Sequence, residues 1–424
     1  MLDIKFIREN KEYVKDGAVK KQYDPKIVDK VLELDEKLRD LRMVVEDLRA
    51  KRNKVSGEVA NEKDTVKKRE LIAGTATLKS ELQLKEEELK KLEGEFKEKM
   101  LWVPNPPDED VPVWKDETGN VEVKKWGSLP HFDSPIKDHV ELGESLGLLD
   151  LERGAKIGGF RGYFLKNDLF LLEQAILNFA MKHMIQKGFT PMSVPWLVNK
   201  EALIGTGYFP WGEEDHYKVQ DDLHLIGTAE VSLTAYYAGE TLNEKDLPVK
   251  LVGLSPCFRR EVGSYGKDTK GIFRLHQFYK VEQVVLCKND HEESVKWHEG
   301  MLKYSEELLQ ALKLPYHILL MCSGDMGPGQ IKKYDIETWF PAQGKYRETH
   351  SDSYFHDFQS RRLNMKYRTE NGEVKFVHTL NNTVIASPRI LGAILENYQQ
   401  KDGSVVIPKV LRDFMGKDKI APTK

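Results

Sequence analysis

Residues 258–282 read FRREVGSYGKDTKGIFRLHQFYKVE, and the second half of this stretch alternates with a period of two. Such a period predicts a β-strand, because successive side chains of a strand point to opposite faces. One parity collects charged and aromatic residues: Arg274, His276, Phe278, Lys280 and Glu282. Buried charges need partners, so this face belongs either on the solvated outside of a sheet or on the floor of a ligand site. The aromatic ring within the charged row favours a floor that binds a charged, partly aromatic ligand.

A second predicted strand, 249–261, would form a hairpin with a strand over 272–285 through a basic loop that contains glycines. Arg259 and Glu261 would share one face of the first strand. An arginine guanidinium binds phosphate through two parallel hydrogen bonds. The hairpin could therefore clamp a phosphate, stack a base on Phe278 and bind an ammonium or hydroxyl group.

The size and composition of the chain narrow the class of protein. A length of 424 residues predicts two or more domains. With 65 basic and 68 acidic residues the net charge is −3, so any nucleic-acid contact must be local. The three cysteines form no CxxC pair, which indicates neither a disulfide framework nor a zinc ribbon. The first residues, MLDIKFIREN, lack a signal-peptide core, and no long apolar run predicts a membrane span, so we expect a cytoplasmic protein without a membrane partner.

Apolar residues recur every seven positions in two blocks before residue 100. The rows of the first block are Leu34, Leu41, Leu48 and Val55, and Leu38, Val45 and Val59; those of the second are Leu82, Leu89 and Phe96, and Leu78 and Leu92. Two such rows predict a coiled-coil seam. The periodicity fades over 57–69, and prolines follow the second block. We therefore predict an antiparallel helical hairpin over about 26–100, an arm of roughly 50 Å at ~1.5 Å per residue.

The charge of this arm is uneven. Residues 26–100 hold 19 basic and 18 acidic side chains, whereas 49–69 hold 8 basic against 3 acidic. A coiled coil is most often a spacer or a dimerisation element, and neither needs a basic tip. An element that binds the phosphates of a nucleic acid does need a basic tip. From charge alone, both interpretations stay open.

Three further segments carry polar groups that suit a charged ligand. Thr228 and Glu230 precede an apolar helical run, where they could equally cap the helix and complement its dipole. Ser387 fits an N-cap, and Arg389 then projects from a helix start that favours anions, or forms an ordinary salt bridge. Glu348 could hold magnesium, which prefers carboxylate and phosphate oxygens. The chain has no GxxxxGK[ST] and no GxGxxG after a strand, so any ATP would bind through arginine and aromatic side chains on an antiparallel sheet.

Together these segments resemble the class II aminoacyl-tRNA synthetases, specifically the seryl-tRNA synthetase family, over essentially the whole chain. The stretch 188–195 is similar to motif 1 of the class, which lies at a dimer interface, 258–278 to motif 2 and 385–396 to motif 3. GTAE at 227–230 and ENYQ at 396–399 are similar to serine-specific features.

The resemblance implies an α+β fold with two domains. Residues 1–105 would form a tRNA-binding domain with the antiparallel coiled-coil hairpin. Residues 106–424 would form a class II catalytic domain, built on an antiparallel β-sheet flanked by helices. The family activates L-serine with ATP and transfers it to the 3′ end of tRNA(Ser), so the resemblance also implies an ATP-dependent ligase, Mg²⁺, a homodimer and a cytoplasmic location.

The resemblance also implies a set of site residues. Catalysis would fall to Arg259 and Arg389, and magnesium would be held with ATP by Glu348 and Ser351. The ATP-binding residues would be Arg259, Arg260, Glu261, Arg274, Phe278, Glu348, Thr349, His350, Ser351 and Arg389. The serine-binding residues would be Thr228, Ala229, Glu230, Arg259, Glu282 and Thr383. The tRNA-binding residues would be Arg49, Lys51, Arg52, Lys54, Lys67, Lys68 and Arg69.

Two segments depart from the pattern of many bacterial members. After Glu348 the chain reads THSDS instead of SSCS, which leaves the roles of His350 and Asp352 open. Motif 3 reads NNTVIASPR instead of NGSGLAVGR, although Thr383 keeps a hydroxyl. Two rival functions remain: a ligase that loads an amino acid onto a carrier protein, whose relatives tend to lack the arm, and a non-catalytic adaptor, against which the intact motif residues argue.

Overall fold

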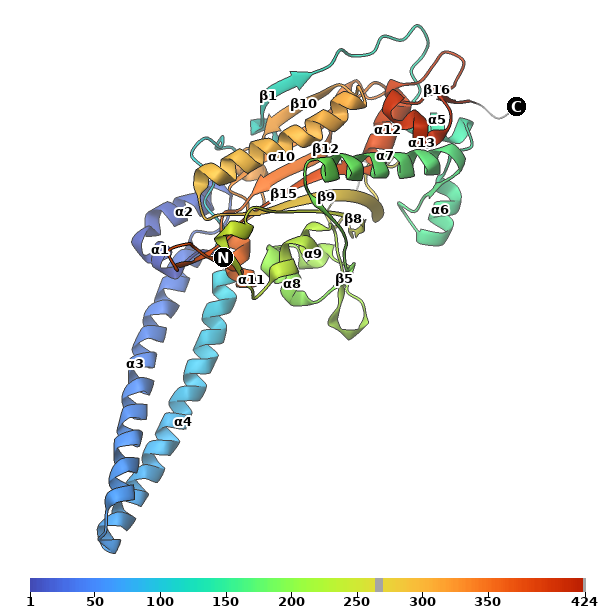
Figure 1. The fold of residues 1–424 in the computed structure, drawn as a ribbon. Coiled ribbons are helices and arrows are strands. Elements are labelled where there is room, and N and C mark those ends of the chain that lie inside the picture. Colours follow the sequence, from blue (N-terminus) through green and yellow to red (C-terminus); the bar gives the residue numbers. More distant parts are fainter. Residues whose placement is uncertain (264–269, 422–424) are drawn as a thin grey trace. The chain divides into compact units, whose positions relative to one another are not determined.

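The computed structural model describes residues 1–263 and 270–421 (Figure 1). The chain divides into two compact units. Leu2–Val19 and Tyr23–Pro104 form the first, which we call the helical unit. Met1, Lys20–Gln22 and Asn105–Lys424 form the second, which we call the sheet unit.

The predicted hairpin is confirmed in the helical unit. After α1 (Ile4–Glu9) and α2 (Lys11–Lys20), the long helices α3 (Lys26–Asn61) and α4 (Thr65–Leu101) run antiparallel, as the blue helices of Figure 1 show. The turn between them is short because Asp64 caps α4, its carboxylate accepting the backbone N–H groups of Val66 and Lys67. The heptad rows form the seam, where these residues are buried: Leu34, Leu38, Leu41, Val45, Leu48 and Leu82.

The sheet unit is built on an eight-stranded sheet in the order β1-β10-β11-β12-β15-β9-β8-β4. In that order the strands are Val121–Trp126, Tyr316–Leu320, Lys332–Phe340, Lys345–Tyr354, His378–Ala386, Gln277–Cys287, Val249–Phe258 and Thr190–Ser193. Neighbours pair antiparallel from β1 to β8, and β4 joins β8 in parallel at the edge. An edge strand tolerates Pro191, which has no N–H for a ladder. The predicted antiparallel sheet is confirmed.

Helices cover both faces of this sheet (Figure 1). On one face lie α7 (Asn167–Gln186), α10 (His291–Ala311) and α12 (Ser387–Asn397), packed over the main core. On the other lie α8 (Lys200–Thr206), α9 (Glu230–Thr234) and α11 (Phe358–Leu363), with a second core.

Smaller elements complete the unit. The remaining helices are α5 (His139–Ser145), α6 (Leu151–Gly158) and α13 (Arg412–Met415). Short strands pair in small sheets: β2 (Leu149–Asp150), β3 (Phe164–Leu165), β5 (Leu197–Val198), β6 (His224–Leu225), β7 (Thr241–Asn243), β13 (Lys366–Arg368), β14 (Val374–Phe376), β16 (Val405–Val406) and β17 (Lys419–Ile420). Within the described residues, each helix is too short or too polar to cross a membrane.

Two local predictions were wrong. The strand expected over 272–285 begins only at Gln277, so Arg274 and His276 precede it. Its partner β8, expected to reach residue 261, ends at Phe258, and three residues later Glu261 takes a left-handed backbone conformation with φ of 57°. Ser387 is the first residue of α12 rather than its N-cap, and its hydroxyl donates to the Glu173 carboxylate (2.7 Å).

Candidate active site

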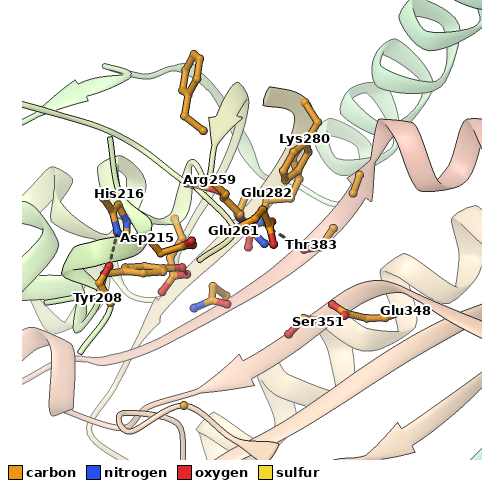
Figure 2. Close-up of a pocket in the computed structure, with 18 of the residues that line it drawn as sticks. Tyr208, Asp215, His216, Arg259, Glu261, Lys280, Glu282, Glu348, Ser351 and Thr383 are labelled. Carbon is orange, nitrogen blue, oxygen red and sulfur yellow. Dashed lines mark hydrogen bonds and ion pairs between the residues drawn. The ribbon is translucent and has the colours of Figure 1, made fainter. Parts of the chain in front are cut away.

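A cavity of about 620 Å³ opens over the ends of β8, β9, β12 and β15. It brings together most of the residues predicted from sequence: Glu230, Arg259, Glu261, Arg274, Phe278, Glu282, Glu348, Thr349, Ser351, Thr383 and Arg389. Figure 2 shows Glu348 and Ser351 on one strand, apart from Tyr208 and His216 on the other side of the cavity. The cavity therefore has distinct ends, which differ in their chemistry.

Arg259 lies where the two ends meet. Its guanidinium carbon is 5.3 Å from the centroid of the Phe278 ring, a cation–π contact. Its Nε donates to the carbonyl oxygen of Gly227 (3.2 Å), just before the segment that leads to Glu230. One arginine thus contacts both an aromatic ring and the backbone of the segment that leads to the buried Glu230.

The first end of the cavity contains two arginines, each paired with a glutamate. Glu261 forms an ion pair with Arg274. Arg389 donates from Nη1 to the carbonyl oxygen of Glu348 (2.6 Å), and the same nitrogen lies 3.3 Å from the Glu348 carboxylate. Partial desolvation alone would raise the pKa of Glu348, whose side chain is 47% exposed, but the positive charges of Arg389 and Lys333 hold that pKa at about 2. Glu348 is therefore ionised throughout the physiological range.

Lys333 and Asp335 belong to this end but escaped the sequence analysis. Lys333 lines the cavity, and its Nζ lies 2.9 Å from the Asp335 carboxylate on the same strand, β11. Burial raises the pKa of Asp335 to about 7. The alternation of KKYDIE, which places Lys333, Asp335 and Glu337 on one parity, is a signal that could have found them.

The second end carries two buried carboxylates, and we call it the closed end for that reason. Glu230 accepts hydrogen bonds from the Tyr208 hydroxyl (2.7 Å) and from Nε2 of Gln359 (2.9 Å). Burial raises the pKa of Glu230 to about 7. Glu282 forms an ion pair with Lys280, whose Nζ also donates to the Thr383 hydroxyl (3.5 Å). Tyr208 and Gln359 come from elements far away in sequence, and no local pattern marks them.

Four predicted residues lie outside the cavity lining. The buried Thr228 hydroxyl accepts the backbone N–H of Glu230 (3.2 Å), as a helix-starting residue does, and Ala229 is buried beside it. Arg260 is exposed and donates to the Glu214 carbonyl oxygen (3.0 Å). His350 is buried, with Nε2 3.1 Å from the Val384 carbonyl oxygen, and burial lowers its pKa to about 4.

The orientation of His350 follows from an irregularity in β12. Glu337 pairs with Glu348 and Ile336 with His350, so Thr349 is an extra residue on this strand. An extra residue interrupts the alternation of side chains. Asp352, two residues on, is also buried, with its carboxylate 3.7 Å from Nε2 of His298. His350 and Asp352, whose roles the family pattern left open, thus lie in the protein interior.

The basic residues at the tip of the hairpin lie on both sides of the α3–α4 turn. Arg49 pairs with Glu86 (2.8 Å) and Lys51 with Asp47 (2.6 Å), in exposed ion pairs. The other predicted tRNA contacts are exposed or half-buried: Arg52, Lys54, Lys67, Lys68 and Arg69. This surface is open to a large anionic partner.

Comparisons with known proteins agree with this geometry. Residues 1–107 match the family model of the seryl-tRNA synthetase N-terminal domain, and residues 214–398 match that of the tRNA synthetase class II core domain (G, H, P, S and T). A serine–tRNA ligase of Deinococcus radiodurans is 46% identical, over 98% of both chains.

Two solved structures share the fold over the whole chain. Seryl-tRNA synthetase from Pyrococcus horikoshii, complexed with ATP, has a TM-score of 0.93 and 41% identity and covers 100% of both chains. Cytoplasmic serine-tRNA ligase from Naegleria fowleri, in complex with AMP, has a TM-score of 0.88 and 34% identity, over 100% of this chain and 99% of that one. The chain belongs to the seryl-tRNA synthetase family.

Proposed function

We propose that this protein activates L-serine with ATP to seryl-adenylate and then transfers serine to the 3′ end of tRNA(Ser). The observation that carries the proposal is the division of one cavity into two ends. Arg259, Phe278 and Arg389 form a cationic and aromatic end that suits a nucleotide. Glu230 and Glu282 form a closed anionic end that suits a small ammonium compound.

ATP would lie across the first end. Phe278 would stack on adenine, and Glu261 would accept a hydrogen bond from the adenine amino group. Arg259 would bind the α-phosphate and Arg389 the γ-phosphate, since a guanidinium matches two phosphate oxygens. Lys333 adds a further cation to this end.

Magnesium would bind at Glu348 and Ser351 together with phosphate oxygens. The low pKa of Glu348 keeps its carboxylate available to a hard cation. Within residues 1–263 and 270–421, no three His, Cys, Asp or Glu side chains converge as a metal site, so most of the remaining ligands must be substrate oxygens and water. When bound, the ion would neutralise phosphate charge.

Serine would occupy the closed end. Its ammonium would pair with a carboxylate, and its hydroxyl would bond to Glu282 and Thr383, which face each other across β9 and β15. Alanine has no hydroxyl and would leave these buried polar groups without hydrogen bonds. It would therefore bind more weakly than serine. Threonine would have to be rejected by its extra methyl group.

In the first step the serine carboxylate would attack the α-phosphorus in line and release pyrophosphate. In the second step a terminal ribose hydroxyl of the tRNA would take the seryl group from the adenylate. Neither step needs a covalent link to the protein. Positioning and charge neutralisation by Arg259 and Arg389 would therefore supply most of the rate.

We assign tRNA binding to residues 1–105 and catalysis to residues 106–424. The basic tip of the hairpin supports a phosphate contact there. Exposed apolar side chains that flank the edge strand β4 in the sequence support a homodimer through that edge: Ile185, Trp196 and Leu197. We place the enzyme in the cytoplasm, with its tRNA.

The test is charging of purified tRNA(Ser) with labelled serine and ATP, run beside serine-dependent ATP–pyrophosphate exchange. Both reactions should proceed with serine and fail with alanine or threonine. Exchange without charging, combined with loading of a carrier protein, would support the rival ligase. Absence of exchange would support the non-catalytic adaptor and refute the proposal.

A further inference from the structure

His139, the first residue of α5, is buried where three elements of the sheet unit meet. Its Nδ1 lies 2.8 Å from the carboxylate of Glu396 on α12. Its Nε2 lies 3.3 Å from the backbone nitrogen of Ile272, in the segment that leads into β9. The ring of Phe273 packs edge-on against it, with centroids 4.9 Å apart. None of the roles assigned above uses this histidine.

The hydrogen bonds determine the proton position on His139. A backbone N–H can only donate, so Nε2 must accept from Ile272, and the proton must be on Nδ1. Nδ1–H then donates to Glu396, whose carboxylate is buried and also accepts the backbone N–H groups of His139 (3.2 Å) and Ala342 (3.0 Å). The imidazole is thus held in one tautomer and one orientation, as a carboxylate-supported histidine is.

Two glycines allow the chain to pack closely around the His139 ring. A Cβ on Gly271, whose φ is +75°, would lie 2.1 Å from Nε2, and a Cβ on Gly392 would lie 3.5 Å from Cγ. Glycine at 271 therefore permits the close approach of the segment to the ring. An ion pair between Lys270 and Asp138 is a second contact between the start of α5 and the segment that leads into β9.

The tethered segment carries groups that face the cavity. The carbonyl oxygen of Phe273 accepts a hydrogen bond from Nε of Arg389 (3.1 Å). The Phe273 ring also supports the guanidinium of Arg347, whose carbon is 4.8 Å from the ring centroid. Arg274, the next residue, pairs with Glu261. A shift of Ile272 would therefore move the Phe273 carbonyl oxygen, which orients Arg389. It would also move Arg274, which pairs with Glu261.

We propose that His139 is a positioning residue for ATP: by binding Ile272 and Glu396 together, it aligns Arg389 and Arg274 with the nucleotide end of the cavity. This inference rests on the proposed function, since it assigns ATP to that end. It predicts an effect on ATP and not on serine, because the serine ligands Glu230 and Glu282 form no hydrogen bond or ion pair with the described residues 270–274 of the tethered segment.

The test compares two substitutions of His139 in the full-length protein. The amide of His139→Asn ends near the Nδ1 position, so it keeps a donor for Glu396 but does not reach Ile272. The amide of His139→Gln extends to the Nε2 position and can restore that acceptor. We expect His139→Asn to raise the Kd and KM for ATP about tenfold, as loss of one buried hydrogen bond does, with KM for serine unchanged, and His139→Gln to recover part of the loss.

Controls separate positioning from folding. His378→Asn removes another buried histidine, one that bonds the Ser294 hydroxyl (2.8 Å), and should leave the Kd for ATP unchanged. If His139→Asn fails to fold, Gly271→Ala displaces the same contact, and Gly239→Ala imposes a similar backbone strain in open space. Only Gly271→Ala should weaken ATP binding.

An unchanged Kd for ATP in His139→Asn, or in Gly271→Ala where the former does not fold, would overturn the inference. Equal losses for ATP and serine, matched by His378→Asn, would also overturn it, because they would indicate a structural role. A wild-type protein that binds ATP without serine-dependent exchange would refute the proposed function alone, and the Kd values of the variants would still decide the role of His139.

Discussion

The helical hairpin and the cavity of the sheet unit are both rich in charge, but they hold their charges in opposite ways. On the hairpin, Arg42 pairs with Glu93 at 2.8 Å while the two side chains stay 54% and 44% exposed. In the cavity, Lys280 and Glu282 pair with side chains only 7% and 2% exposed. Exposed pairs contribute little to stability and exchange partners freely, whereas a buried charge that loses its partner is strongly destabilising.

This difference separates two kinds of recognition. Exposed charges on a long hairpin can follow a large polyanion whose phosphates attract them over a distance set by the salt concentration. Buried, mutually paired charges are already oriented before a ligand arrives, so little reorganisation is needed at the moment of reaction. Substitutions in the cavity should therefore act on chemistry, and substitutions on the hairpin only on the RNA-dependent step.

The largest effect is expected from Arg259→Ala, which should abolish both reactions. Arg259 connects the Phe278 ring to the Gly227 carbonyl oxygen, and its charge would lie at the α-phosphate. We expect serine-dependent pyrophosphate exchange to fall by at least about 10²–10³-fold, as when a preorganised donor is removed. Arg42→Ala, which removes an exposed arginine of the hairpin, is the matched control and should leave exchange intact. Near-normal exchange in Arg259→Ala would show that the motif 2 assignment is wrong.

The next effect is confined to one reaction. Deletion of residues 32–97 removes most of α3 and α4, which belong to the helical unit. Exchange should persist, since the cavity lining lies entirely in the sheet unit, and charging of tRNA(Ser) should be lost. Exchange in the same preparation serves as the folding control. If tRNA(Ser) were still charged by this variant, the hairpin would not be the element that binds the tRNA.

The two regions also differ in how far sequence could predict them. The hairpin follows from residues seven apart, such as Leu34, Leu41 and Leu48, because each seam contact repeats along the same helix. In the sheet unit, alternation correctly placed Phe278 and Glu282 on β9 but started the predicted strand too early, at Ile272 instead of Gln277. β8 and β9 pair only as far as Phe258 and Gln277, and no pattern of apolar and polar residues reveals where this pairing stops.

Two residues at the closed end of the cavity were missed and one residue was wrongly assigned to the cavity, each for a physical reason. Tyr208 and Gln359 reach Glu230 from the loop after α8 and from α11, so their proximity depends on how the helices of one face of the sheet pack together. The extra residue at Thr349 turned His350 into the interior, against the expectation of an ATP contact. Resemblance to a family supplied the candidate residues, but only the backbone geometry determined which of them line the cavity.

A smaller effect is expected from neutralising the tip of the hairpin. Replacing Lys67, Lys68 and Arg69 by Gln should weaken tRNA binding and reduce the slope of log K against log salt by up to about 2–3, with each phosphate contact contributing ~0.7–0.9. Exchange should not change. The matched control replaces Lys79, Lys90 and Lys91, exposed residues of α4 away from the turn, with equal loss of charge. An equal effect from both triple variants would show that net charge, and not the tip, attracts the tRNA.

The smallest effect is a dependence of serine binding on pH, because the carboxylates of Glu230 and Glu348, at opposite ends of the cavity, titrate differently. Burial raises the pKa of Glu230 to about 7, so its carboxylate becomes neutral, and unable to pair with the serine ammonium, as the pH falls through that value. KM for serine in the exchange reaction should rise by up to about tenfold per pH unit below the pKa. KM for ATP should show no such inflection from Glu348, whose pKa of about 2 keeps it ionised.

A variant of the Glu230 hydrogen-bond network tests the cause of this pH dependence. Nε2 of Gln359 donates to the Glu230 carboxylate and so favours its ionised form. Gln359→Leu removes that donor and should move the inflection in serine KM to higher pH, whereas Glu230→Gln should remove the inflection and leave serine binding weak at every pH. A wild-type serine KM that is flat through neutral pH, or an inflection that survives in Glu230→Gln, would show that another group titrates. Burial would then not control the ionisation of Glu230, and the carboxylates of the closed end would behave like the exposed carboxylates of the hairpin.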